Sequence, residues 1–201
     1  TQYSYDGRGN ITGLNLPNGN TVSMTYDKLN QLIQVSDNIG EYYSYSYDNI
    51  GNLLSAKDAN GNATDFTYDA LSRKITSSDA LGYSSLISYD NNFNVTTIND
   101  KSGKVRTFTY DALNRRTGSK SALNFITSFA YDVAGNLTSV TDANGHATSY
   151  VYDNLNRHNL ITYADGTTNS LAYDANGNVI SLIDAAGATT EYVYDALNRL
   201  T

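Results

Sequence analysis

The chain contains no cysteine and no tryptophan, and only one proline, one methionine and two histidines among its 201 residues. The lack of cysteine excludes disulfides, thiolate catalysis and zinc–thiolate sites. The 13 Lys and Arg against 20 Asp and Glu give a net charge of −7, which argues against nucleic-acid binding, because that binding needs a basic surface. No apolar run approaches the ~20 residues of a membrane-spanning helix, and we expect no signal peptide at residue 1.

Tyrosine is abundant by contrast, with 18 copies in the chain. Tyrosine followed by aspartate recurs every 21 residues without an insertion, at Tyr5, Tyr26, Tyr47, Tyr68, Tyr89, Tyr110, Tyr131, Tyr152, Tyr173 and Tyr194. A fixed period of this length is typical of repeat architectures, in which each unit is stabilised by its neighbours. We therefore interpret residues 1–201 as one array of about nine and a half units, an excerpt of a longer protein.

Each unit is predicted to be a β-hairpin. A large apolar or aromatic residue precedes each of these tyrosines by two positions, a period that predicts a strand with one buried face. A turn follows each Tyr-Asp pair, and a second turn lies near a glycine fourteen residues after the tyrosine. Asn124 replaces this glycine once, and asparagine also tolerates positive φ. Two strands and two turns leave no room for a helix, so the fold class is all-β.

Consecutive units alternate in their first turn. Odd units favour Gly-Asn, as at Gly51-Asn52, whereas even units favour Leu-x-Arg, as at Leu113–Arg115. The true unit is therefore predicted to be 42 residues long, with two non-equivalent hairpins. The fifth unit departs from the glycine pattern with Phe93, where we expect a local irregularity.

An isolated hairpin is at best marginally stable, so neighbouring hairpins are expected to pair into one long spiralling antiparallel sheet. Aromatic residues at equivalent positions would then stack as ladders across the strands. The strand at each end of the array would have an unpaired edge, which predicts self-association.

The segment Tyr45–Leu53, which reads YSYDNIGNL, and the run YDALNRL at 194–200 resemble the YD repeat of the Rhs family. The resemblance covers essentially the whole chain. The family includes bacterial Rhs polymorphic toxins, the shell component of insecticidal toxin complexes, wall-associated proteins and teneurins. The resemblance implies a spiral β-sheet that closes as a hollow shell, which in the bacterial toxins encloses a C-terminal toxin domain. The family's Asp-Pro-x-Gly core is not found, because the only proline, Pro17, lies in LPNG.

The candidates for chemistry in the sequence are weak. The strict repetition of the Tyr-Asp pairs favours a structural role, with the aspartate bonding backbone N–H groups of the turn. Asp58 and Asn60 are spaced like early calcium ligands, but the later ligands of such a loop are missing. His146 and His158 have no second histidine nearby, which favours a role beside turns. We predict no catalytic, cofactor-binding or metal-binding residue.

The favoured hypothesis is therefore a non-enzymatic scaffold, part of a secreted or cell-surface shell around a covalently linked C-terminal toxin or cargo domain. The alternative is an extracellular adhesin or fibre that binds carbohydrate or assembles with itself. Four tyrosines lie outside the repeat positions, and any binding function is predicted to involve them first: Tyr42, Tyr43, Tyr83 and Tyr163.

Overall fold

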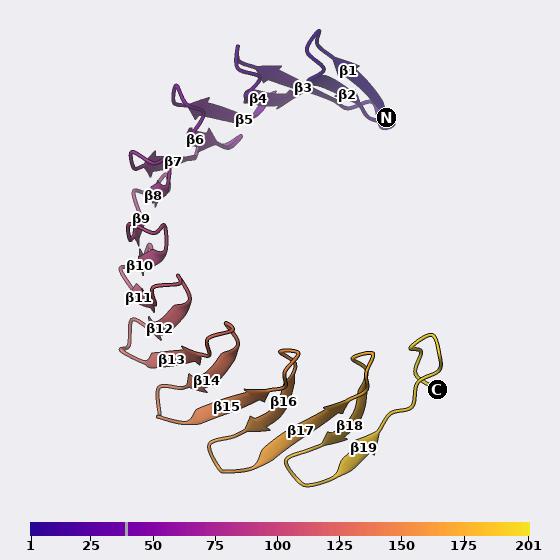
Figure 1. Cartoon of the computed structure of the whole chain (residues 1–201). Coiled ribbons are helices and arrows are strands. Elements are labelled where there is room, and N and C mark those ends of the chain that lie inside the picture. Colours follow the sequence, from indigo (N-terminus) through magenta and orange to yellow (C-terminus); the bar gives the residue numbers. More distant parts are fainter. Residues whose placement is uncertain (39) are drawn as a thin grey trace. The chain divides into compact units, whose positions relative to one another are not determined.

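The computed structural model describes residues 1–38 and 40–201, apart from the side chain of residue 41, and it is all-β. Neighbouring strands are antiparallel and follow each other in chain order as a series of hairpins (Figure 1). The predicted fold class is thus confirmed. The chain divides into two compact units, Thr1–Val105 and Arg106–Thr201.

The first unit is an antiparallel meander in which each strand pairs with the next one along the chain. Its strands are β1 (Gln2–Tyr5), β2 (Ile11–Asn15), β3 (Thr21–Tyr26), β4 (Leu32–Asp37), β5 (Gly40–Tyr47), β6 (Leu53–Lys57), β7 (Ala63–Tyr68), β8 (Lys74–Ser78), β9 (Ser84–Tyr89) and β10 (Val95–Asn99).

The second unit has the same construction, and the 21-residue period continues into it without a change of register. Its strands are β11 (Val105–Tyr110, of which the first residue belongs to the first unit), β12 (Arg116–Lys120), β13 (Ile126–Tyr131), β14 (Leu137–Thr141), β15 (Ala147–Tyr152), β16 (His158–Thr162), β17 (Thr168–Tyr173), β18 (Val179–Ile183) and β19 (Thr189–Glu191).

Every Tyr-Asp tyrosine at the end of a strand follows a β-bulge. In β3 and β4, for example, Thr25 pairs with Gln34 but Tyr26 pairs with Leu32, so the second strand carries one extra residue, Ile33. The same shift recurs in β13 and β14 and in β17 and β18. A bulge bends the strand and increases its local twist, and here it does so once in each repeat.

The Tyr-Asp turns and most of the described second turns share one backbone geometry. In the turn Asp58–Asn62, the Gly61 N–H donates to the Asp58 carbonyl (3.0 Å) and the Asp58 N–H donates to the Asn62 carbonyl (2.9 Å). The fourth residue has positive φ, as in hairpin loops that close a type I turn with a left-handed residue. At the predicted second-turn position, Asn124 has a φ of 65°, which confirms its role as a substitute for glycine. Phe93, the predicted irregularity, has a φ of 69°.

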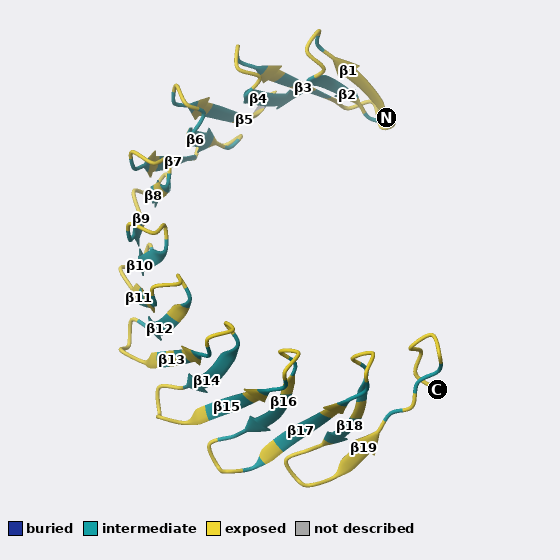
Figure 2. Ribbon diagram, viewed as in Figure 1, coloured by how far each residue is buried: buried dark blue, intermediate teal, exposed yellow. Residues whose placement is uncertain are grey.

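The expectation of a buried face needs correction. Strands β3 and β13 show the predicted period of two; in β13, Thr127, Phe129 and Tyr131 are half-buried while the residues between them are exposed. Strands β4, β10 and β14 are half-buried along their whole length. Yet no residue in the described part of the chain is buried, and Figure 2 shows that most strands are largely half-buried between exposed turns, whereas β1 and β19 are exposed. Both faces of the sheet lack a covering layer, so the alternation that predicts a core face produces only half-burial.

Candidate functional site

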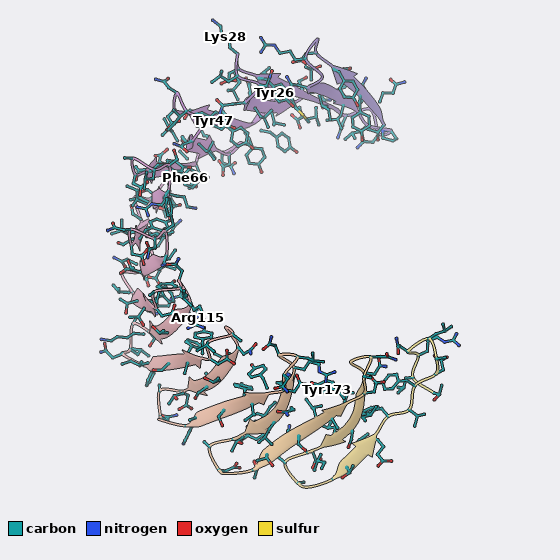
Figure 3. The ribbon with its side chains drawn as sticks, viewed as in Figure 1. Tyr26, Lys28, Tyr47, Phe66, Arg115 and Tyr173 are labelled. Atoms are coloured by element: carbon teal, nitrogen blue, oxygen red, sulfur yellow. The ribbon has the colours of Figure 1, made fainter. Side chains whose placement is uncertain are left out.

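The Tyr-Asp tyrosines connect each repeat to the one before it. The Tyr26 hydroxyl donates to the Ile11 carbonyl (2.9 Å), and the Tyr47 hydroxyl donates to the Leu32 carbonyl (2.9 Å; Figure 3). The acceptor always lies 15 residues earlier and is the residue that pairs with the preceding tyrosine, as Tyr5 pairs with Ile11. The same bond recurs from the hydroxyls of Tyr68, Tyr89, Tyr131, Tyr152 and Tyr173.

This bond satisfies a backbone carbonyl at a place where the ladder between hairpins has ended. The pairing of β2 with β3 runs from Asn15–Thr21 to Gly13–Ser23 and does not include Ile11. A backbone acceptor that is withdrawn from water without a partner is unfavourable. The tyrosine hydroxyl therefore replaces the missing ladder bond, and its ring covers the junction between two hairpins.

A second connection runs from even repeats to the following odd repeat through arginine. Arg115 contacts Asp111 of its own turn (Nε to Oδ2, 2.7 Å) and donates to the Asp132 carbonyl of the next Tyr-Asp turn (2.8 Å). Its guanidinium also lies 4.8 Å from the ring centroid of Tyr131, a cation–π distance. Arg73 and Arg157 make the equivalent contacts with the repeats that follow them. Figure 3 labels Arg115, and also Tyr173, which is the ring that Arg157 contacts.

The connection from odd to even repeats uses asparagine instead. The Asn136 amide donates to Asp132 Oδ2 (2.9 Å) and to Asn156 Oδ1 of the next repeat (2.9 Å). Asn156 is the residue with positive φ in its own turn. Asn10, Asn52 and Asn178 form the same link to Asn30, Ser72 and Asn198. The alternation of Gly-Asn with Leu-x-Arg in the sequence thus reflects two different junctions, which explains the 42-residue unit.

Hydrogen bonds within the turn favour the charged form of Asp132 and Asp58. Asp132 accepts the Asn136 amide and backbone N–H, and its pKa is lowered chiefly by the Asn136 side chain. In the second type of turn, Asn62 lowers the pKa of Asp58 in the same way. The predicted role of the aspartate as an acceptor of turn N–H groups is therefore confirmed. The carboxylate accepts hydrogen bonds from groups of its own turn.

The tyrosines outside the repeat positions fall into separate places. Tyr42 and Tyr43 lie in β5, where their ring centroids are 5.8 Å apart, and the ring of Tyr43 stacks on that of Tyr45 at 6.4 Å. Both Tyr42 and Tyr43 are exposed. Tyr83 is exposed in the turn that precedes β9. These ring contacts lie within one strand, whereas Tyr-Asp tyrosines such as Tyr131 contact neighbouring strands through a hydroxyl–backbone bond and an arginine contact.

Tyr163 lies beside one of the two histidines. A shallow, open hollow of about 460 Å³ is lined by His146, Thr148, Tyr163, Ala164 and Asp165. His146 Nδ1 is 3.2 Å from Asp142 Oδ2, and the Tyr163 hydroxyl accepts from the Asn169 amide (3.0 Å). His158 is exposed in β16, where its backbone carbonyl accepts the Tyr173 hydroxyl (2.8 Å). The hollow brings together one of the four tyrosines and one histidine, but His158 lies elsewhere.

The calcium-like spacing of Asp58 and Asn60 is explained by the turn. Asp58 Oδ1 accepts the backbone N–H groups of Asn60 and Asn62, and Oδ2 accepts the Asn62 amide. Among the residues that the structure describes, no group of three or more His, Asp or Glu side chains could hold a metal ion. The described residues also include no helix long and apolar enough to cross a membrane.

The sequence interpretation missed the junction residues. The arginine of Leu-x-Arg and the asparagine of Gly-Asn were visible as an alternating pair, but their partners lie 17 to 20 residues further along the chain. The signal that could have found them is their fixed position, five residues after every Tyr-Asp tyrosine. In the described turns, the side chain at this position reaches the next repeat at Arg115 and Asn136. The third turn residue does the same at Arg8 and Asn176.

The fold is similar to that of solved toxin-complex structures. The crystal structure of TcdB2-TccC3 matches with a TM-score of 0.75 and 17% identity, over 98% of this chain and 13% of that chain. The crystal structure of TcdB2-TccC3-TEV matches with a TM-score of 0.72 and 17% identity, over 98% of this chain and 12% of that chain. The chain thus spans only a small part of the proteins that it resembles. At this identity the likeness establishes the fold alone.

Family models identify the repeat itself. The RHS Repeat model matches residues 26–63 and 47–84, and the Teneurin YD-shell model matches residues 84–200, more than half of the chain. A search of curated proteins finds no match. The predicted Rhs resemblance is confirmed, and the fold and family are those of a structural shell protein. The chain belongs to the teneurin YD-shell family.

Proposed function

We propose that this chain is a wall segment of a closed, secreted or cell-surface shell, and that the shell encloses a toxin or cargo domain linked to the same polypeptide. The wall performs no catalysis. Its function is to separate the enclosed domain from the surrounding solution.

The observation that carries this proposal is the match to the YD-shell model on a sheet that is one layer thick. A one-layer sheet with tyrosine, arginine and asparagine junctions at every repeat can extend to cover a large area without a hydrophobic core. The similar TcdB2-TccC3 structures support the same role for this chain. The use of Asp132 and Asp58 as acceptors within their own turns is consistent with a wall.

The test is electron microscopy of the full-length protein that contains this array, combined with limited proteolysis. We expect closed particles with internal density, and a C-terminal domain that is protected from protease while the shell is intact. Open sheets or fibres, together with a C-terminal domain that is cleaved at the rate of the isolated domain, would contradict the proposal.

A second candidate function is carbohydrate binding at β5. The observation that favours it is the group of neighbouring rings at Tyr42, Tyr43 and Tyr45, of which the first two are exposed. Exposed aromatic faces can stack on the apolar faces of sugar rings, as they do on other apolar surfaces.

A glycan array tests this candidate. Specific binding that is lost in Tyr43→Ala but retained in Tyr83→Ala, an exposed tyrosine outside β5, would support an adhesin. Absence of binding by the wild-type chain would leave the shell as the only proposal.

A further inference from the structure

The Tyr-Asp turns carry exposed aliphatic side chains along one margin of the sheet. We call this margin the YD margin and define it by the third residues of the Tyr-Asp turns, at six of which a large aliphatic side chain is 59% to 75% exposed: Leu29, Ile50, Leu71, Leu113, Leu155 and Leu197. In two further turns an adjacent position carries the exposed apolar residue, Phe93 or Val133. An exposed apolar side chain, which we call a tip, therefore occurs in most Tyr-Asp turns of each unit.

The turn geometry does not require these aliphatic residues. The second turns, which form the opposite margin, have the same backbone hydrogen bonds and the same positive φ at the fourth residue. Their third residue is polar in most described turns, as at Asn60, Ser102 and Asn144. Leu81, Leu123 and Ala186 are the exceptions among the described second turns. Since identical turns accept asparagine on one margin, the aliphatic residues on the other margin indicate a contact with a partner.

At three of the six tips, the charge also suits an apolar contact. Below Leu71, Leu113 and Leu155, the turn aspartate forms an ion pair with the arginine of the same turn, at 2.6 to 2.7 Å. Each pair is neutral as a whole, so a partner that covers the leucine does not bury an unpaired charge.

We propose that the YD margin is a docking surface for the YD margin of a second copy of this chain. Within a unit, successive tips are separated by two strands, or roughly 9–10 Å. A partner that contacts successive tips needs apolar side chains with the same period, and the chain's own YD margin supplies that period. The contact is isologous, since the same surface is used by both copies. A contact between two chains is a property separate from the enclosure of cargo.

The test is the self-association of the 201-residue chain, measured by sedimentation velocity over a wide range of concentration. A variant with all six tip residues changed to asparagine (Leu29→Asn, Ile50→Asn, Leu71→Asn, Leu113→Asn, Leu155→Asn and Leu197→Asn) should associate at least about tenfold more weakly than the wild type. The turns should still form, because Asn60, Asn144 and Asn176 occupy this position naturally. The matched control, Leu81→Asn with Leu123→Asn on the opposite margin, should associate like the wild type.

Three results would overturn the proposal: a wild-type chain that stays monomeric throughout, a control that weakens association as much as the tip variant, or a tip variant that associates like the wild type. The last result is the one that pairing of strand edges would give.

A second measurement does not depend on the folding of the six-site variant. The chain has no cysteine, so Ala70→Cys next to Leu71 and Ala80→Cys next to Leu81 place single thiols at equivalent positions on the two margins. Alkylation of the thiol should slow as the protein concentration rises for Ala70→Cys but not for Ala80→Cys, and the same concentration dependence for both would contradict the inference.

Discussion

The two margins of the sheet use the same turn for different purposes. On the YD margin the fifth residue of the turn reaches the next repeat, as Asn136 reaches Asn156 and Arg115 reaches Asp132. On the opposite margin the same position serves its own turn, as Asn62 bonds Asp58. A contact between repeats on that margin is the ion pair of Lys101 with Asp79 (2.9 Å). The contrast shows that turns with the same backbone geometry can differ in their side-chain contacts. The side chain of the fifth turn residue determines whether that residue bonds only within its own turn or also to the next repeat.

Acid should have the largest effect, because it acts on both margins at once. The folded-state pKa values of Asp58 and Asp132 are lowered from the ordinary value of an aspartate, chiefly by the amides of Asn62 and Asn136. A lowered folded pKa contributes stability that is present above the unfolded pKa and lost as the pH falls through the folded pKa. The melting temperature should therefore change little from about pH 7 to pH 5 and fall steeply below about pH 4. A melting temperature that is equal at about pH 5 and pH 3 would show that the turns do not need charged aspartates.

Removal of a junction tyrosine should have the next largest effect. Tyr131→Ala removes a half-buried ring, its contact with Arg115 and the hydroxyl that donates to the Arg116 carbonyl (2.9 Å). We expect a loss of about 2–3 kcal/mol in the free energy of unfolding, less than for a fully buried aromatic. Tyr131→Phe should cost about 1 kcal/mol, which is the part due to the hydrogen bond.

Urea denaturation measures both losses, and Tyr83→Ala is the control on the opposite margin. Tyr83 is exposed, so its replacement should change the free energy of unfolding by less than about 0.5 kcal/mol. Equal losses for Tyr131→Ala and Tyr83→Ala would remove the distinction between the margins.

The repeat, the strands and the turns could all be predicted from the sequence because they depend on local chemistry. The spacing of Tyr26 and Met24 specifies a strand, and a left-handed residue such as Gly61 specifies the end of a turn. These signals lie within a few residues of the structure that they determine, and the period repeats them ten times.

The junctions and the extent of burial could not be predicted in the same way. Period two in a strand shows that its faces differ, but not whether another layer covers either face, and Phe129 is only half-buried. The partners of Arg115 depend on how far the next hairpin is offset, which is set by the bulge before Tyr110 and by sheet twist. The sequence of a single repeat does not show this long-range geometry.

The arginine junction should be weaker than the tyrosine junction. Arg115→Ala removes a guanidinium that stacks on Tyr131, a contact that contributes about 0.5–1 kcal/mol at partly exposed sites. The ion pair with Asp111 adds little, because both groups contact solvent. Arg115→Lys should recover only part of the loss, since lysine cannot contact Asp111 and the Asp132 carbonyl with one planar group.

The matched control for the arginine is Lys101→Ala, which removes the ion pair between repeats on the opposite margin. We expect a change of a few tenths of a kcal/mol at most, because surface pairs of this kind contribute little. Thermal unfolding of the three variants measures the difference, and a larger loss for Lys101→Ala than for Arg115→Ala would reverse the ranking of the margins.

The asparagine junction should show the smallest effect and the cleanest contrast. Asn136 and Asn62 both bond the aspartate of their own turn, but only Asn136 also donates to a described side chain of the next repeat, Asn156. The loss in the free energy of unfolding should therefore be about 0.5–1 kcal/mol larger for Asn136→Ala than for Asn62→Ala, which is the contribution of one neutral hydrogen bond. A double-mutant cycle with Asn156→Gly, which keeps the positive φ of that residue, isolates the bond between repeats. A coupling energy of zero would mean that the two asparagines stabilise only their own turns, and that in odd repeats the two margins are energetically the same.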